Sequence, residues 1–429
     1  MKPQLILGQT LRFKGDPFSG DPGASAIHDT RGGVLVADGR IEAVGPGSDL
    51  HAAHPDAAVT DLGDALLIPG FVDAHAHYPQ TGIIASWGKR LIDWLESYTF
   101  PEEMRFADPA HAAQVAETYL ETCIANGTTS LCSFCTIHPQ SVDAIMAAAE
   151  ARGMRIAAGR VMMDRDTAPE GLRDTAQSSH DESAALIAKW HGKGRLGYAI
   201  SPRFAPTSTE AQLEAAGALW AQNPTCLMQT HLSEQVEEIA WVRSLYPDDE
   251  DYLSIYERHG LAGPGALMGH AIHLTERERA ALRRTGSAVI HCPTSNTIIG
   301  SGLCDVRGLK ALGIPVGLAT DVGGGSSFSM LRTMAAAYEI SQLRGDPLHP
   351  AELLWLATEG SARALRMDQV GRLAPGMEAD LIALDLASTP IIAQRASRAE
   401  TLWEALFPTI MMGDDRAISA VWIAGRRAR

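Results

Sequence analysis

The chain has 429 residues, of which 45% are apolar and 20% charged, as in an ordinary globular protein. Its formal net charge of −15 argues against a nucleic-acid partner or an anionic membrane surface. Six cysteines are too few for a disulfide framework, and the sequence shows neither a signal-peptide core nor the roughly 20 apolar residues of a membrane span. We therefore expect a cytoplasmic protein.

Both ends of the chain are rich in predicted strands. Residues 33–44 have the pattern of a hairpin with a tight turn at Asp38 and Gly39, and residues 1–68 contain no long helical pattern. Residues 379–386 and 420–425 are also strand-like. Because chain termini often lie close together, we expect residues 1–68 and 370–429 to form one small β-sandwich domain.

The middle of the chain alternates between apolar runs and helical patterns. Helices are predicted at 108–126, 141–152, 207–222 and 275–285, with capping residues at their starts or glycines at their ends. The apolar runs lie at 66–74, 127–134, 155–163, 196–204, 226–232, 266–273, 287–292 and 315–321. This alternation favours a (β/α)8 barrel of the TIM type over residues 69–369, with an α/β fold for the whole chain.

Titratable residues end several of these predicted strands. The first strand closes on His75 and His77, which point to the same face because they are two residues apart. Later strands end in His231, His270 and Asp321. Because sites in such barrels form at the carboxyl ends of the strands, we expect these side chains to converge.

The residue types at these strand ends suit a divalent metal ion. Neutral imidazoles and one carboxylate are ligands for Zn²⁺ or Fe²⁺, so His75, His77, His231 and Asp321 are the predicted ligands of one ion per subunit. Such an ion would lower the pKa of a bound water to about 7. Glu234, three residues after His231, is the predicted proton shuttle for that water.

Two further histidines compete with His270 or remain unassigned. His270 and His273 are three residues apart and cannot both face inward from an extended strand, so we assign His270 to the water or substrate, or as an extra ligand. His291 either lies near the site or is structural.

Cys132 and Cys135 have CxxC spacing without a second pair, which leaves a structural zinc site or buried thiols open. The glycines at 323–325 lack the ending of a phosphate-binding loop and are interpreted as a turn that lets Asp321 approach the metal.

The sequence PGFVDAHAH at 69–77, together with the later His, His and Asp residues, resembles the metal-dependent amidohydrolase superfamily. Within it, the chain resembles the guanine deaminases, through the segments 75–80, 94–102, 201–206, 230–234 and 292–296. The resemblance implies hydrolysis of guanine to xanthine and ammonia in purine catabolism, by a homodimer. It also implies that Gln80, Arg203 and Phe204 hold the purine, with Leu91 and Trp94 lining the pocket.

The chemistry of these side chains agrees with that implication. Arg203 offers a rigid fork of donors to the acceptors of guanine, Gln80 can donate and accept on the same edge, and Phe204 can stack on the flat ring. Three alternatives remain open. They are an amidohydrolase for another heterocycle (an adenosine derivative, cytosine or a triazine), a metal-containing protein that binds purines without turnover, and a structural or interaction protein.

Overall fold

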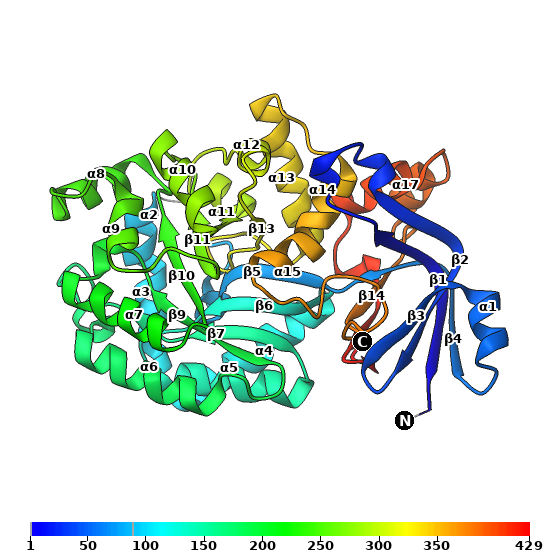
Figure 1. Cartoon of the computed structure of the whole chain (residues 1–429), viewed down its shortest axis with the longest axis horizontal. Coiled ribbons are helices and arrows are strands. Elements are labelled where there is room, and N and C mark those ends of the chain that lie inside the picture. The colour runs from blue at the N-terminus through cyan, green and yellow to red at the C-terminus, as the bar shows by residue number, and fades with distance from the viewer. Residues whose placement is uncertain (1, 88–89) are drawn as a thin grey trace.

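The computed structural model describes residues 2–87 and 90–429, which form a barrel and a smaller sheet beside it (Figure 1). Among the described residues, eight parallel strands follow one another around the barrel in chain order, which confirms the predicted α/β barrel. They are β5 (Phe71–His77), β6 (Thr128–Phe134), β7 (Arg155–Gly159), β9 (Leu196–Pro202), β10 (Leu227–Leu232), β11 (Ala266–His270), β12 (Ala288–His291) and β13 (Val316–Leu318). A short strand, β8 (Val161–Met162), also pairs with β9.

The barrel closes where the last strand meets the first. The backbone N–H of Asp321 donates to the carbonyl of His75 at 3.0 Å, and the N–H of Thr320 donates to the Asp73 carboxylate at 3.0 Å. Asp73 is fully buried, and burial raises its pKa to about 7 against the hydrogen bonds from Thr320 that lower it. These bonds bring the end of β13, and Asp321 with it, beside the two histidines of β5.

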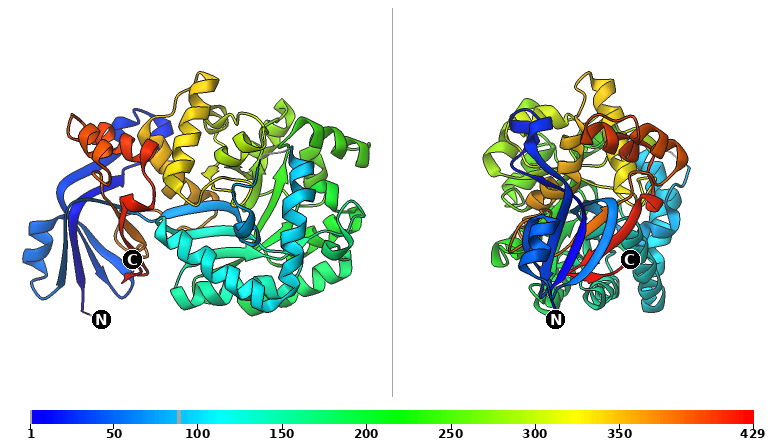
Figure 2. Two further views of the ribbon diagram at one scale, coloured as in Figure 1. Left: turned by 180° about the vertical axis from the view of Figure 1, so that it is seen from behind. Right: turned by 90° about the vertical axis from the view of Figure 1, so that its right-hand side faces the viewer.

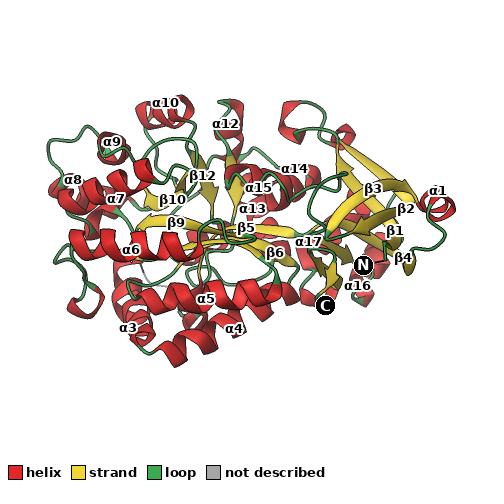
Figure 3. Ribbon diagram, turned by 60° about the horizontal axis from the view of Figure 1, so that its bottom comes forward, coloured by secondary structure: helices red, strands yellow, loops and turns green. Residues whose placement is uncertain are grey.

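Helices pack around the strands, and Figure 3 shows α4 to α6 along one side of the barrel. Asp108 caps α4 by accepting from the N–H of Ala110, and Gly153 ends α5 with φ +67°. The predicted helices are observed within a few residues of their expected bounds. Including three that were not predicted (α6, α8 and α13), the longer helices of the barrel are α4 (Pro109–Ala125), α5 (Pro139–Arg152), α6 (Ala176–Trp190), α7 (Glu210–Gln222), α8 (Val236–Leu245), α10 (Glu276–Thr285) and α13 (Met330–Arg344).

Shorter helices fill the loops at both ends of the barrel. Two of them, α2 and α3, lie between β5 and α4 and cover the carboxyl end of the barrel. The others follow later strands or precede the last sheet strands. The set is α2 (Leu91–Trp94), α3 (Phe100–Met104), α9 (Tyr252–Arg258), α11 (Pro293–Ile298), α12 (Val306–Ala311), α14 (Pro350–Trp355) and α15 (Ser361–Ala364). None of the helices in the described part of the chain has the length and apolarity needed to cross a membrane.

Several predicted strands end earlier or start later than expected, and three of these differences concern the site. The run at 66–74 divides at Gly70, because its first part continues the smaller sheet and only its second part enters the barrel. The last barrel strand stops at Leu318, and Asp321 follows it with φ +50°. The strand at 266–270 stops at His270, where φ is +65°, and this leaves His273 in the following loop.

The smaller sheet joins both ends of the chain, and both termini lie on its side of the molecule (Figure 2). Within the described residues its strands are hydrogen-bonded in one continuous order, because β4 pairs with β1 on one side and with β14 on the other. In order, they are β16 (Arg426–Arg427), β15 (Ile418–Ile423), β14 (Leu381–Leu384), β4 (Ala58–Pro69), β1 (Gln4–Phe13), β2 (Ala26–Ala37) and β3 (Arg40–Pro46).

The expected hairpin is present in this sheet. Strands β2 and β3 are joined at Asp38 and Gly39, both of which have positive φ, as a tight hairpin turn requires. Helices α1 (Gly47–Ala53), α16 (Pro390–Ala396) and α17 (Leu402–Met412) accompany the sheet. The exact domain boundaries at 68/69 and 369/370 stay a prediction.

Ion pairs connect the smaller sheet to the amino ends of the barrel strands. Arg155, at the start of β7, and Arg195, just before β9, both donate to Glu378, at 2.8 and 2.9 Å. Arg195 also pairs with the buried Asp380 at 2.5 Å. The second carboxylate oxygen of Asp380 accepts from the N–H of Ala424 at 2.8 Å. Each buried charge in this amino-end network, defined as these four side chains, therefore has a partner.

Candidate active site

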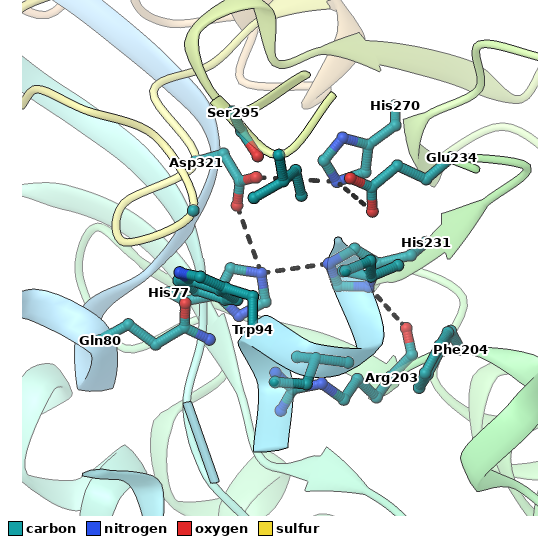
Figure 4. A pocket seen from close by; sticks show the side chains of 14 residues that line it. His77, Gln80, Trp94, Arg203, Phe204, His231, Glu234, His270, Ser295 and Asp321 are labelled. Carbon is teal, nitrogen blue, oxygen red and sulfur yellow. Dashed lines mark hydrogen bonds and ion pairs between the residues drawn. The ribbon is translucent and has the colours of Figure 1, made fainter. Parts of the chain in front are cut away.

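A pocket of about 420 Å³ lies at the carboxyl end of the barrel. Figure 4 shows side chains from several strand ends and from the loop helix α2 pointing into it. It is lined by all of the residues that the sequence places in the site except His75, which lies buried beneath. The lining members are His77, Gln80, Leu91, Trp94, Arg203, Phe204, His231, Glu234, His270 and Asp321.

Three histidines and one aspartate lie together at the floor of this pocket or, in the case of His75, directly beneath it. The Nε2 atoms of His77 and His231 are 3.1 Å apart, and those of His75 and His77 each lie 3.5 Å from Oδ1 of Asp321. The three imidazoles also have nitrogen atoms within 4.8 Å of one another. We call His75, His77, His231 and Asp321 the floor cluster.

The imidazoles of the floor cluster are held neutral. Burial lowers the pKa of His75 and lowers those of His77 and His231 well below the usual value, with the neighbouring histidines adding to the effect at His231. Nδ1 of His231 lies 2.7 Å from the carbonyl of Arg203, which can only accept, so Nδ1 carries the proton. The bare Nε2 of His231 therefore points into the cluster.

Asp321 is held ionised beside these rings. Burial alone would raise its pKa, but the neighbouring imidazoles of His75, His270 and His77 outweigh burial and lower it. A carboxylate and neutral imidazoles whose lone pairs converge form a donor set suited to a divalent ion.

The floor cluster passes a test of fit for such an ion. Ligand atoms 2.0–2.1 Å from a shared zinc ion lie roughly 3.3 Å apart at tetrahedral angles. The separation of 3.1 Å between His77 and His231, and those of 3.5 Å from Asp321 to His75 and to His77, bracket that value. In addition, the buried Nε2 of His75 has no hydrogen-bond partner among the described residues. A buried polar atom without a partner is costly, and a ligand bond would satisfy it.

Two titratable side chains stand over the floor cluster. Oε2 of Glu234 and Nε2 of His270 are 3.6 Å apart, and the same nitrogen lies 3.7 Å from Asp321. Burial raises the pKa of Glu234, against the opposing effects of His270 and of the Ser301 hydroxyl, which donates to Oε1 at 2.7 Å. Burial would lower the pKa of His270, but the carboxylates of Glu234 and Asp321 reverse that effect and raise it.

A polar edge and an apolar wall complete the pocket. Arg203 and Gln80 both lie within hydrogen-bond distance of Glu103, whose carboxylate accepts from Nη1 of Arg203 at 2.7 Å and from Nε2 of Gln80 at 2.9 Å. Leu91, Trp94 and Phe204 are buried and pack in one apolar cluster. The pocket therefore combines an acid–base floor with one polar edge and one apolar wall.

Several residues in or next to the site were missed by sequence reasoning. Glu103 directly follows the segment 94–102 that carried the family resemblance, and this adjacency was the only signal for it. Asn296, at the end of the segment 292–296, has its Oδ1 2.8 Å from Nδ1 of His270. Nothing in the sequence marked Ser301. Cys292 lies with His75, His270 and Asp321 in a second group of potential ligands, but burial raises its pKa well above the usual value, which favours the thiol.

The structure also shows where the histidines, cysteines and glycines lie that the sequence left without a definite role. Nε2 of His273 lies 2.8 Å from the carbonyl of Ser301, and His291 is buried outside the pocket lining. Cys132 and Cys135 are buried thiols that join neither group of potential ligands in the described chain. Gly324 lies so close to the site that an added Cβ would be 3.2 Å from the carboxylate of Asp321.

A parallel barrel that gathers histidines and one aspartate at its carboxyl end defines a metal-dependent hydrolase. The chain belongs to the amidohydrolase family, whose model matches residues 66–428. A model of an imidazolonepropionase-like composite domain of bacteria matches residues 32–57, in the smaller sheet.

Several relatives of similar length are guanine deaminases. The enzyme of Escherichia coli strain K12 is 41% identical over 406 residues, covering 94% of this chain and 92% of that protein. A solved structure of an E. coli guanine deaminase superimposes with a TM-score of 0.95 at 38% identity, covering 100% of this chain and 99% of that one. The structure from C. acetobutylicum, with guanine bound in its active site, gives a TM-score of 0.90 at 28% identity, covering 99% and 100%.

Proposed function

We propose that this chain hydrolyses guanine to xanthine and ammonia. The observation that carries the proposal is one pocket in which the floor cluster and Glu234 lie opposite a polar edge made by Arg203 and Gln80. The similarity to guanine deaminases along nearly the whole chain supports the same substrate.

We also propose that the floor cluster holds one zinc ion per subunit, with iron(II) as the alternative. His75, His77, His231 and Asp321 would be its ligands, because the three imidazoles converge and are neutral, and Asp321 lies 3.5 Å from two of them. When bound, such an ion supplies a Lewis acid that makes a water molecule nucleophilic at neutral pH.

Glu234 is proposed to move the protons of the reaction. Its raised pKa suits a group that must both take up and release a proton near neutral pH. Oε2 takes a proton from the attacking water and gives it to N3 of guanine while the water oxygen adds to C2. A second proton passes from that oxygen to the amino group through Glu234 or Asp321. The C2–N bond then breaks, ammonia leaves and C2 becomes a carbonyl.

The polar edge is proposed to orient the ring for this attack. An arginine has five N–H donors, so the bond from Arg203 to Glu103 leaves others for the carbonyl and ring nitrogen of guanine. Gln80 would add a donor and an acceptor on the same edge, and Phe204 would stack on the ring. Leu91 and Trp94 would close the pocket over it. His270 would hydrogen-bond the water or the substrate.

This edge also separates the proposal from its alternatives. A pocket for a 6-amino purine would have little use for arginine donors at the carbonyl position. A protein that only binds purines would not need a buried glutamate over the floor cluster. No observation favours either alternative.

An assay on a panel of nucleobases tests the proposed function. Purified protein is incubated with guanine, adenine and cytosine, and the ultraviolet spectrum and ammonia release are followed, with elemental analysis of the same sample. We expect conversion of guanine alone and one zinc or iron per chain. Conversion of adenine or cytosine in place of guanine would refute the proposal.

We further propose that the protein acts in purine catabolism in the cytoplasm as a homodimer, without nucleic-acid or membrane partners. The net charge of −15 supports the absence of an anionic partner. Size-exclusion chromatography with light scattering tests the dimer, since a mass of one chain at micromolar concentration would contradict it.

A further inference from the structure

The polar edge of the pocket depends on one buried carboxylate that does not itself line the pocket. Glu103 lies on α3 and is 1% exposed. Its Oε2 accepts from Arg203 and its Oε1 accepts from Gln80, so both oxygens are used. The contacts join a loop helix to residues 100 and 23 positions away in the chain.

These contacts fix which way the amide of Gln80 faces. Nε2 of Gln80 donates to Glu103, and Oε1 accepts from the N–H of Gly323 at 3.3 Å. A carboxylate only accepts and a backbone N–H only donates, so a flipped amide would lose both bonds. The pattern of donors and acceptors that Gln80 presents to a ligand is therefore set by its neighbours.

The same carboxylate neutralises the charge of Arg203. The pair is 2.7 Å apart, with side chains that are 4% and 1% exposed, so water screens it weakly. Without Glu103, the edge would carry an uncompensated positive charge and would attract anions. With Glu103, it offers arginine donors without a net charge.

We propose that Glu103 is a positioning and specificity residue, which orients Gln80 and neutralises Arg203 so that the pocket binds neutral purines in preference to purine anions. This inference rests on the proposed function, in which the substrate guanine is neutral and the product xanthine readily loses a ring proton. A neutral edge binds the substrate and releases the anion of the product.

The test compares two purines of similar shape and different charge. Dissociation constants of xanthine and hypoxanthine are measured by titration calorimetry on metal-loaded, full-length protein, at a mildly alkaline pH where xanthine is mainly an anion and hypoxanthine mainly neutral. The readout is the ratio of the two constants, which does not depend on turnover.

The Glu103→Gln variant removes the charge and keeps the size of the side chain. In this variant, the dissociation constant of xanthine divided by that of hypoxanthine should be about tenfold lower than in the wild type, or lower still. It should raise KM for guanine about tenfold and change kcat by less than about threefold, because the contacts lie at the binding edge. Equal weakening of both purines, or an unchanged ratio, would overturn the proposal.

Two other variants control this result. Glu103→Asp keeps the charge, so it should keep the wild-type ratio even if both purines bind more weakly. Glu102→Gln is the same substitution one residue earlier, where the carboxylate pairs with Arg105 and His111, away from the pocket, and both constants should stay unchanged. A ratio that shifts in either variant as it does in Glu103→Gln would refute the role of the Glu103 charge.

A second variant, which should shift the ratio of the dissociation constants in the opposite direction, tests the proposal if Glu103→Gln does not fold. Arg203→Met leaves Glu103 as an uncompensated negative charge, so it should weaken xanthine at least about tenfold more than hypoxanthine. Equal weakening would overturn the proposal. Guanine turnover by the wild type is measured separately. If the wild type releases no ammonia from guanine but the variants shift the ratio of the two dissociation constants, only the proposed function is refuted. If the wild type does release ammonia but the ratio does not shift in the variants, only this inference is refuted.

Discussion

The two ends of the barrel differ in how their buried titratable side chains are paired. At the amino end, the network of Arg155, Arg195, Glu378 and Asp380 pairs every charge with an opposite one. At the carboxyl end, neutral imidazoles crowd together, and Nε2 of His75 has no hydrogen-bond partner in the part of the chain that the structure describes. Barrel enzymes place chemistry at the carboxyl end and stability at the other, so this contrast predicts separable effects of mutation.

Removal of the metal should have the largest effect on turnover. Dialysis against a chelator is expected to lower kcat for guanine by more than about 10³-fold, because the floor cluster alone supplies no Lewis acid. Adding back Zn²⁺ or Fe²⁺ should restore activity, with the metal content followed by elemental analysis. Full turnover by protein that contains no metal would contradict the assignment of the floor cluster.

Glu234→Gln comes next in size. The amide cannot shuttle protons, so kcat should fall by about 10²–10⁴-fold while the metal content stays at the wild-type value. Glu237→Gln is a matched control, because that side chain is 64% exposed and pairs with Arg90 at the surface. Unchanged turnover in Glu234→Gln would remove Glu234 from the proposed mechanism.

Arg203→Ala should act mainly on binding. Loss of charged hydrogen bonds to the purine is expected to raise KM for guanine roughly 10–100-fold. Since the change also leaves Glu103 unpaired, the melting temperature is recorded on the same sample. A KM that barely moves in folded protein would show that Arg203 does not hold the substrate.

Arg195→Ala should change stability and leave turnover within about twofold of the wild type. It breaks a pair with the buried Asp380, which costs about 3 kcal/mol of unfolding free energy, measured with denaturant. Arg152→Ala is the control, because its partners Glu117 and Glu121 are more than half exposed, and it should cost less than about 1 kcal/mol. A large loss of activity in folded Arg195→Ala would break the separation between the two ends.

The sequence was sufficient to predict the residues that lie on regular elements. His75 and His77 could be predicted because the two-residue period of a strand places both on one face. His231 and His270 followed because parallel strands end at the same rim. The alternation of apolar runs and helical patterns predicted the barrel for the same reason.

The features that were missed depend on irregular backbone or on distant contacts. Asp321 itself was predicted, but the strand expected to reach it stops three residues earlier, and the left-handed conformation of Asp321 is encoded by no apolar pattern. Glu103, on a loop helix, is hydrogen-bonded to Arg203, which is 100 residues away in the sequence, and to Gln80, which is 23 residues away. Periodicity describes one element at a time, so it could not predict contacts between a loop helix and two strand ends.

The bond between His231 and residue 203 has a consequence for how this site could diverge. It uses the main-chain carbonyl of Arg203, which every amino acid possesses. Replacement of the guanidinium by another side chain would keep that anchor for the imidazole. A substitution at position 203 could therefore change which heterocycle the pocket binds while His231 and the rest of the floor cluster keep their positions.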